Sequence, residues 1–412
     1  MPSLTLENRW PRYASFAAGL GMIVFSALTI QHFFAANYPA SIYAGSFCDI
    51  NAFFNCNSSA FSPLALVAGV PLGYFGLFMG ALVCLGALFP SEKFERTNHS
   101  LAWLNAIGVV SLGAYSVIAT RSLCLLCSGY YVFSLVSLVL FWRFGIDRDD
   151  PSLRKRWVRP SPKYLATFAV LLAVGAYGFR EYHITKKEAQ SGSAAAKVVE
   201  QYFSLPTVKT PTLVSPYWTA RATENFEDAP IQVIEYADFL CPDCLYLSKQ
   251  MQRLKEEFKG KLNVAFQFFP LEGKCNHVVA KDLHPGACEV AYIAAAVGPE
   301  KFAAIHDEIF ANYNSAKRNP EWRSGLARRY GVESAMADAA LQERVRQIIE
   351  TGAEYDQTSD KYAHGVRSTP TLIINNRMVI GTFPYEQLRA IFQALVNKRE
   401  QRKFMEKWQE GK

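Results

Sequence analysis

The sequence predicts a polytopic α-helical membrane domain followed by a separate α/β domain. Five apolar runs with few charges occupy residues 13–182, whereas residues 183–412 have the charged composition of a water-soluble domain. In this second part, a buried-strand pattern leads directly into a C-x-x-C motif and then a helical pattern. A chain of 412 residues is long enough for two or three domains.

The apolar runs predict five transmembrane helices. A helix needs about 20 apolar residues to cross a hydrocarbon layer of roughly 30 Å, because lipid offers backbone polar groups no partner outside the helix. The first run has the position of a secretory signal peptide, but it is long and has no small-residue cleavage pattern. The predicted spans are residues 13–35, 64–89, 102–121, 128–145 and 164–180.

Lys and Arg residues in the short loops predict the orientation of these spans. The N-terminal segment and the loops after the second and fourth spans are basic, whereas residues 36–63 contain no Lys or Arg. We therefore expect a cytoplasmic N-terminus and, after five spans, a C-terminal part outside the membrane. The predicted divisions are a membrane domain at 1–150, a basic loop, fifth span and linker at 151–206, and an outside domain at 207–412.

The net charge of +7 is explained by this topology, because the basic cytoplasmic loop would lie against anionic lipid headgroups. A nucleic-acid surface interleaves aromatic residues with basic ones, and these loops do not. No nucleic-acid partner is therefore predicted.

Eight of the nine cysteines fall on or near the outer side of the membrane in this topology, where disulfides form and persist. The exception is Cys84, within the second span, which we expect to pack as a small apolar residue. The other eight group along the chain as Cys48/Cys56, Cys124/Cys127, Cys241/Cys244 and Cys275/Cys288.

The pair Cys241/Cys244 lies between a strand pattern at 231–238 and a helical pattern at 245–258. Cys241 is thus expected at a helix N-terminus, where backbone N–H groups and the helix dipole favour a thiolate. The thiolate is the attacking species in disulfide exchange, so this pair is predicted to be redox-active. The alternatives are a structural disulfide or half a zinc site, but no second C-x-x-C follows within about 15–20 residues, as a zinc ribbon requires.

This arrangement resembles the thioredoxin superfamily in its DsbA-like branch. Glu235 lies six residues before Cys241, where the resemblance implies a buried carboxylate that helps to move a proton to the second cysteine. Pro370 matches the family's cis-proline, which faces the active-site sulfur. A largely helical insertion is expected at about 276–365.

Cys275 and Cys288 are expected to form a structural disulfide at the start of this insertion. A metal site that combines the two thiols with His277 and His284 has suitable ligand types. A redox-active pair nearby, in an oxidising compartment, argues against free thiols here, so we predict a disulfide and no metal.

The membrane pair Cys124/Cys127 is ambiguous alone, since a C-x-x-C at a span boundary also fits packing or lipidation. It is accompanied by the loop pair Cys48/Cys56, then Ser62 and a Gly-x-Pro motif at 69–71. Together these features resemble the vitamin K epoxide reductase family, in its bacterial form fused to a thioredoxin-like domain. The resemblance implies a four-helix bundle plus a fifth linking span in a bacterial inner membrane, with the thioredoxin-like domain in the periplasm.

The resemblance also implies a quinone-linked thiol–disulfide oxidoreductase that makes disulfides in exported proteins. Electrons would pass from substrate thiols through Cys241/Cys244, Cys48/Cys56 and Cys124/Cys127 to a membrane quinone, either ubiquinone or menaquinone. Cys127 would be the sulfur nearest the quinone ring, and Ser62 would hydrogen-bond to a quinone oxygen. No metal or flavin is implied.

Asp243, between the two cysteines, disfavours the neighbouring thiolate relative to the histidine of strong oxidants, which predicts a weaker oxidant. Two alternatives therefore remain open. One is a reductase of a quinone or quinone epoxide for cofactor recycling, with the fused domain as electron donor. The other is a membrane-tethered thiol chaperone, in which the cysteine pairs only hold the fold.

Overall fold

The computed structural model describes residues 9–38, 56–89, 91–120, 122–144, 160–191, 193–209, 213–279, 282–355 and 365–410. They form two compact units, one made of Arg9–Asn37 and the described residues from Cys56 to Glu188, and one made of Tyr38 and the described residues from Ala189 on. Cys48, a predicted relay cysteine, lies outside the described residues.

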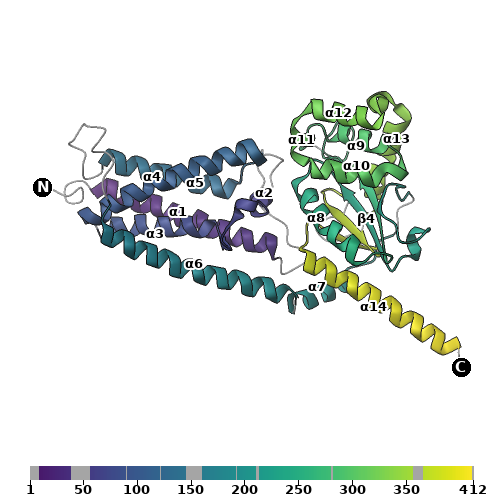
Figure 1. The fold of residues 1–412 in the computed structure, drawn as a ribbon, viewed down its shortest axis with the longest axis horizontal. Coiled ribbons are helices and arrows are strands. Elements are labelled where there is room, and N and C mark those ends of the chain that lie inside the picture. The colour runs from purple at the N-terminus through teal and green to yellow at the C-terminus, as the bar shows by residue number, and fades with distance from the viewer. Residues whose placement is uncertain are drawn as a thin grey trace. The chain divides into compact units, whose positions relative to one another are not determined.

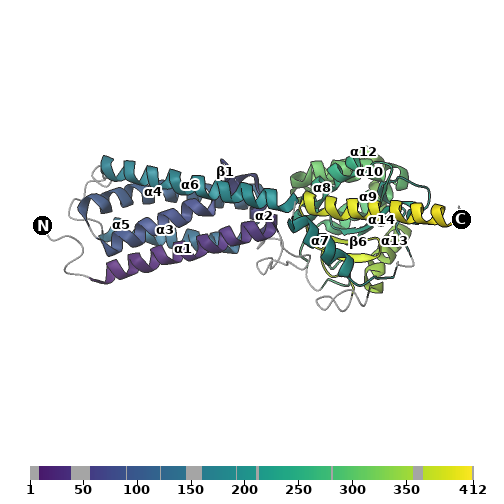
Figure 2. The ribbon, with the colours of Figure 1, turned by 90° about the horizontal axis from the view of Figure 1, so that it is seen from below.

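The first unit is a bundle of helices that run side by side in two perpendicular views (Figure 1, Figure 2). Among the described residues, four helices are long and apolar enough to cross a membrane, at Trp10–Asn37, Glu92–Ile118, Leu125–Phe144 and Pro162–Ala189. The prediction of a polytopic helical membrane domain is thus confirmed. The main helices are α1 (Arg9–Asn37), α3 (Gly73–Leu88), α4 (Glu92–Tyr115), α5 (Leu125–Phe144) and α6 (Pro162–Ser191).

The second predicted span is shorter than the sequence indicated, because α3 begins at Gly73 rather than at residue 64. Ser62 caps a 3₁₀ turn, η1 (Pro63–Ala65), and a small hairpin follows in which Ala68 and Gly69 have φ of 51° and 82°. The 16 residues of α3 cover about 24 Å, less than the roughly 30 Å of a typical hydrocarbon layer. The other short elements here are α2 (Cys56–Ala60), β1 (Leu66–Val67), β2 (Val70–Pro71) and a π-helical turn, η2 (Ser116–Thr120).

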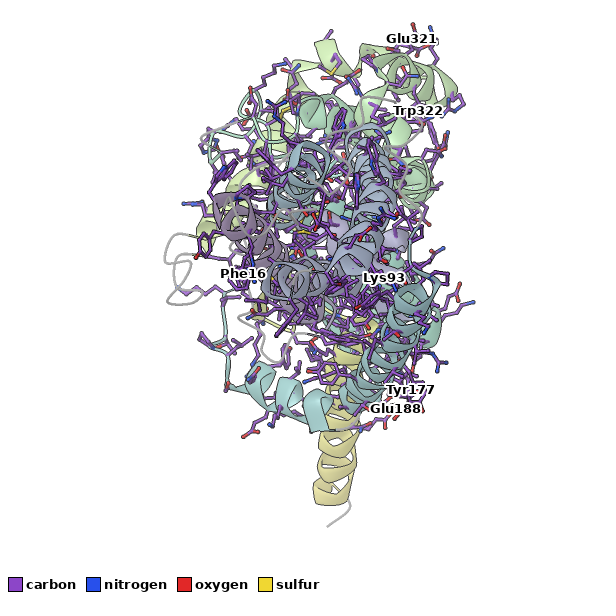
Figure 3. The ribbon with its side chains drawn as sticks, turned by 90° about the vertical axis from the view of Figure 1, so that its left-hand side faces the viewer. Phe16, Lys93, Tyr177, Glu188, Glu321 and Trp322 are labelled. Carbon is purple, nitrogen blue, oxygen red and sulfur yellow. A yellow bond between two sulfur atoms is a disulfide. The ribbon has the colours of Figure 1, made fainter. Side chains whose placement is uncertain are left out.

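Helices α1 and α3 meet through glycines. A Cβ atom added to Gly80 would lie 2.9 Å from the carbonyl oxygen of Gly19 and from the amide nitrogen of Ile23. Lipid gives no hydrophobic drive for helices to associate, so small residues that let backbones approach closely stabilise such pairs. Cys84 packs in the same seam, with its Sγ 3.5 Å from the carbonyl oxygen of Phe16, which is labelled on α1 in Figure 3.

Polar side chains join the remaining helices of the bundle. Asn105 of α4 donates to the Ser134 hydroxyl of α5 over 2.6 Å and accepts from the Tyr130 hydroxyl over 2.7 Å. The Tyr74 hydroxyl of α3 donates to the Leu172 carbonyl of α6 over 2.9 Å. These bonds fix how α5 and α6 are turned about their own axes.

The second unit is built on a five-stranded mixed sheet in the order β3-β5-β4-β6-β7. The central strand β4 pairs parallel with β5 and antiparallel with β6. The strands are β3 (Trp218–Ala220), β4 (Ile231–Ala237), β5 (Leu262–Phe268), β6 (Thr371–Ile374) and β7 (Arg377–Ile380).

Helices cover both faces of this sheet, with the insertion on one side and the terminal helices on the other (Figure 1). Neighbouring residues of β4 point to opposite faces, so Val233 packs in one core and Ile234 in the other. The predicted α/β domain with a helical insertion is thereby confirmed. The insertion contains α9 (Ala287–Ala296), α10 (Pro299–Ala311), α11 (Tyr313–Arg318), α12 (Pro320–Tyr330) and α13 (Ala339–Glu350), and the other face carries α7 (Ser193–Ser204), α8 (Pro242–Glu257) and α14 (Tyr385–Glu410).

Part of the segment expected to be a linker packs in the second unit. This unit includes the chain from Ala189 on, whereas the sequence predicts that residues 151–206 lie outside the domain. Val198 and Tyr202 of α7 are fully buried, and the Tyr202 hydroxyl donates to the Ile374 carbonyl over 2.7 Å. The apolar residues of α7 therefore pack on the sheet, and α7 is not a flexible linker.

The glycine contact between α1 and α3 gives a testable prediction. Gly80→Ala should lower the thermal unfolding midpoint of the detergent-solubilised chain, because its methyl group must push two backbones apart at a cost of about 1–3 kcal/mol. Gly108→Ala is the matched control, since a Cβ there meets nothing within 4 Å. Equal midpoints for the two variants would contradict the close packing of α1 on α3.

Candidate functional site

The C-x-x-C pair of the second unit lies at the start of α8. Cys241 is the N-cap residue, and Pro242 follows at the first helical position, where its missing N–H costs no hydrogen bond. Cys241 Sγ lies 3.5 Å from the carbonyl oxygen of Thr369, and the Thr369–Pro370 peptide bond is cis. The loop that leads into β6 thus brings the carbonyl group that precedes Pro370 to Cys241.

Cys244 is buried more deeply than Cys241, with exposed fractions of 0% and 4%. The backbone N–H of Asp238 donates to Cys244 Sγ over 3.5 Å. Burial raises the pKa of the Cys244 thiol well above its usual range, and the hydrogen bond with Cys241 acts in the same direction. Cys244 therefore keeps its proton until a base removes it.

Glu235 is a buried carboxyl on the central strand β4. Desolvation raises the pKa of Glu235 to about 7, and the positive charge of Lys255 opposes this shift only partly. Its Oε1 atom has no hydrogen-bond partner among the described residues. A carboxyl that titrates near neutral pH can accept and release a proton under ordinary conditions, as a general acid–base group requires.

Asp238 and His284 form a buried pair beside the motif, and this contact is not predicted by the sequence. The Asp238 carboxylate accepts from the backbone N–H groups of Leu240 and Leu271 over 2.7 and 2.8 Å. His284 Nδ1 lies 2.6 Å from Asp238 Oδ2. The carboxylate therefore fixes the turn that leads into the C-x-x-C motif. The position of Asp238 at the end of a strand was the only signal of this role in the sequence.

The loop that carries His284 is closed by a disulfide between Cys275 and Cys288, with an S–S distance of 2.03 Å. The two sulfurs considered as metal ligands are thus bonded to each other, and His284 is engaged by Asp238. Among the residues that the structure describes, no three His, Cys, Asp or Glu side chains are grouped to hold a metal ion.

The membrane pair repeats the placement of the soluble pair. Cys124 directly precedes α5, and the backbone N–H of Cys127 donates to Cys124 Sγ over 3.2 Å. The Ser59 hydroxyl lies where it can hydrogen-bond to either sulfur. Amide and hydroxyl donors around a sulfur favour its anionic form, so this site too suits thiolate chemistry.

Cys56 joins the membrane pair in one cluster. It lies at the start of α2, is fully buried, and packs with Cys124, Leu126 and Cys127. Cys56 is disulfide-bonded, whereas Cys124 and Cys127 are unbridged. The structure therefore brings one cysteine of the predicted loop pair beside both cysteines of the membrane pair.

A cavity of about 650 Å³, counting the part open to solvent, adjoins these cysteines. Ser62 lines this cavity together with Cys127, as do the unforeseen residues Tyr131 and His32. Tyr131 follows Cys127 by four residues on α5, so its position on the same helix face was readable from spacing. The lining residues are Thr29, His32, Phe33, Cys56, Ser59, Ala60, Ser62, Leu64, Ala65, Pro71, Leu72, Gly73, Leu112, Tyr115, Ser116, Cys124, Cys127 and Tyr131.

The fold and the two C-x-x-C sites define a polytopic membrane protein that carries a thioredoxin-like unit. Residues 13–142 match the model of the vitamin K epoxide reductase family, and residues 226–394 match a thioredoxin family model. The membrane part is thus a vitamin K epoxide reductase family domain, fused to a thioredoxin-like domain as the sequence resemblance implied.

Curated relatives match parts of the chain. A probable disulfide bond formation protein D of Bacillus cereus is 36% identical over 99 residues, which cover 23% of this chain and 41% of that protein. A Na(+)/H(+) antiporter NhaA 1 of Mycolicibacterium gilvum is 25% identical over 151 residues, which cover 36% of this chain and 22% of that protein. The chain thus spans less than half the length of these relatives.

Solved structures of thiol–disulfide proteins also align with the chain. Wolbachia pipientis α-DsbA1 aligns at 15% identity and a TM-score of 0.34, covering 42% of this chain and 88% of that one. MdbA, a thiol-disulfide oxidoreductase from Corynebacterium diphtheriae, aligns at 15% identity and a TM-score of 0.33, covering 48% and 99%.

The raised pKa of Glu235 predicts a pH-dependent stability. The folded unit binds this proton up to a pH of about 7, whereas a carboxyl in the unfolded chain releases it near pH 4.5, so wild-type stability falls as pH rises through this window. Glu235→Gln should therefore stabilise the unit by about 3 kcal/mol at pH 8 and by little at pH 4.

Urea unfolding of the second unit in the full-length chain, monitored by limited proteolysis, measures the change in unfolding free energy at pH 8 and at pH 4. Glu256→Gln, an exposed change on α8, is the control. A Glu235→Gln effect of the same size at both pH values would rule out the buried, protonated carboxyl.

Proposed function

We propose that this chain is a quinone-linked thiol–disulfide oxidoreductase that introduces disulfides into exported proteins. Electrons move from substrate thiols to Cys241/Cys244, then to Cys48/Cys56, then to Cys124/Cys127, and finally to ubiquinone or menaquinone. The observation that carries this proposal is the cavity in which Cys56, Cys127 and Ser62 meet.

The lining of the cavity suits a quinone headgroup in its chemistry. Sites for small organic ligands are mostly apolar, with a few polar groups that fix orientation. Phe33, Leu72 and Leu112 supply apolar walls, and Ser62 and Tyr131 supply hydroxyl groups. The Ser62 hydroxyl accepts from the Leu64 N–H over 3.2 Å and can still donate its own hydrogen to a carbonyl oxygen. A bound quinone would supply an acceptor for two electrons and two protons.

The soluble pair takes the electrons from the substrate. A substrate thiolate attacks the Cys241 sulfur of the Cys241–Cys244 disulfide, and the electron pair of the broken S–S bond leaves on Cys244. Glu235, whose pKa is raised to about 7 by desolvation, provides a proton for Cys244 in this step and takes it back on reoxidation. The second substrate thiolate then releases Cys241 and closes the substrate disulfide.

The loop pair connects the two C-x-x-C sites. Disulfide exchange requires direct contact between sulfurs, so Cys48/Cys56 must meet one partner and then the other. The position of Cys56 beside Cys124 supports the second handover. Cys127, on the cavity wall, is then the sulfur from which electrons leave to the acceptor.

This order of electron transfer places all three pairs on one side of the membrane. The N-terminus is cytoplasmic and the thioredoxin-like domain is periplasmic, in a bacterial inner membrane. The basic loops described above, together with residues 36–63, which contain no Lys or Arg, support this orientation.

Removing the last sulfur tests the relay. Cys127→Ala in the purified chain should reduce quinone consumption, driven by a reduced unfolded protein, to the rate without enzyme, because the sulfur that passes electrons to the quinone is gone. Cys84→Ala is the control and should retain wild-type turnover, since Cys84 lies in the α1–α3 seam outside the cavity lining. Undiminished quinone reduction by Cys127→Ala would refute the relay.

Trapping tests the direction and the enzymatic class. Cys244→Ser should accumulate mixed disulfides between Cys241 and exported proteins, because the resolving thiol is gone. Non-reducing gels and mass spectrometry of the Cys241 peptide measure them, and Cys241→Ser should give none. A membrane-tethered chaperone without thiol exchange predicts no adducts in either variant, and a quinone reductase predicts quinone consumption without substrate oxidation.

A further inference from the structure

The helical insertion brings a lysine to the turn that carries Cys241. Lys317 lies on α11, and its Nζ atom donates to the Tyr313 hydroxyl over 3.1 Å. Tyr313, only 7% exposed, donates in turn to the carbonyl oxygen of Leu240 over 2.8 Å. Leu240 directly precedes Cys241, so two hydrogen bonds connect an ammonium group to the backbone beside the reactive sulfur.

We propose that Lys317 is a positioning residue whose ammonium group, held by Tyr313 against the Leu240–Cys241 turn, stabilises the thiolate of Cys241 and sets its reactivity in disulfide exchange. The inference rests on the proposed function in one respect, namely that Cys241 is the sulfur that exchanges with substrates.

The charges around Lys317 agree with this geometry. Burial lowers the pKa of Lys317, and the strongest opposing effect of a charge comes from the Cys241 sulfur, ahead of Asp238. Asp243 of α8 acts in the same direction as Asp238, whereas Arg318 of α11 acts against them. The charges of Cys241, Asp238 and Asp243 thus all favour the ammonium form of Lys317.

This arrangement modifies the expectation drawn from the dipeptide between the cysteines. Asp243 alone disfavours a neighbouring thiolate, and the motif has no histidine to offset it. An ammonium group delivered from another helix opposes the effect of Asp243. Lys317 of the helical insertion thus supplies a positive charge near Cys241, in place of the histidine that strong oxidants carry between their two cysteines.

The positive charge of Lys317 acts at the step in which Cys241 leaves the mixed disulfide. When the second substrate thiolate attacks the substrate sulfur of the mixed disulfide, the bond from that sulfur to Cys241 breaks and its electron pair leaves on Cys241. The substrate is oxidised to a disulfide and the Cys241/Cys244 pair ends as a dithiol. A nearby ammonium group stabilises the leaving thiolate, so Lys317 favours release of oxidised substrate.

The test is the pH dependence of Cys241 alkylation in the reduced full-length chain. Iodoacetamide labelling at pH 5–9, resolved peptide by peptide by mass spectrometry, isolates Cys241 from the other thiols. We expect Lys317→Gln to slow alkylation at pH 6 about three- to tenfold and to move the alkylation midpoint to higher pH, because one positive charge is lost near the sulfur. Lys317→Arg should restore the wild-type profile, since it keeps the charge.

Two further variants separate charge from packing. Lys249→Gln removes the same charge from the exposed part of α8 and should leave the profile unchanged. Tyr313→Phe keeps Lys317 but removes its hydrogen-bonded anchor, and should shift the midpoint in the same direction by a smaller amount. It also provides a second test if Lys317→Gln does not fold.

An unchanged alkylation profile in both Lys317→Gln and Tyr313→Phe would overturn the inference. Slower alkylation in Lys317→Gln that persists in Lys317→Arg would overturn it as well. Either result would leave the proposed function intact. Failure of the wild-type chain to oxidise a reduced protein with quinone, in contrast, would refute the proposed function and leave the alkylation result standing.

Discussion

A sulfur placed at the first turn of a helix is the arrangement on which both C-x-x-C sites depend. Cys124 precedes α5 and Cys241 caps α8, so each pair has one cysteine at the helix end and the other within the first turn. Free backbone N–H groups at a helix start make this the natural location for a thiolate, in a membrane bundle as in a soluble sheet. The rest of each unit positions partners around that turn, namely a hydroxyl from Ser59 in one case and a loop ending in Pro370 in the other.

Local features of the two units were predictable from sequence because neighbouring residues determine them. Apolar runs define membrane helices, and a strand pattern followed by C-x-x-C defines the start of α8. The start of α3 could not be predicted, because apolar residues continue from residue 64 to Gly73 and only Gly69 and Pro71 interrupt them. The sequence also did not predict that α7 packs in the second unit, because a segment rich in Ala and Ser does not indicate which surface it packs against.

Contacts between distant segments were not predictable from one sequence. His284 meets Asp238 across 46 residues, and Tyr313 meets Leu240 across 73. Each of these residues has an ordinary local context, so no spacing pattern marks them. His284 was considered only as a metal ligand, because histidine near two cysteines is a compositional signal, whereas a hydrogen bond to a buried carboxylate depends on the folded loop. The proximity of Cys56 to Cys124 likewise follows from the packing of α2 beside α5.

The bonds from Asn105 to Ser134 and Tyr130 have a consequence for how variants of the membrane unit behave. At 3.6 residues per turn, Cys124, Cys127, Tyr131 and Ser134 share one stripe of the chain at and after the start of α5. The hydrogen bonds with Asn105 of α4 therefore fix the rotation of α5 about its axis, and with it the side chains that line the cavity. A substitution that breaks these bonds changes which groups of α5 face the cavity, although no cysteine is altered. In a mutational scan, a substitution of Ser134 would therefore resemble the loss of a cysteine, although Ser134 lies about two helical turns from Cys127.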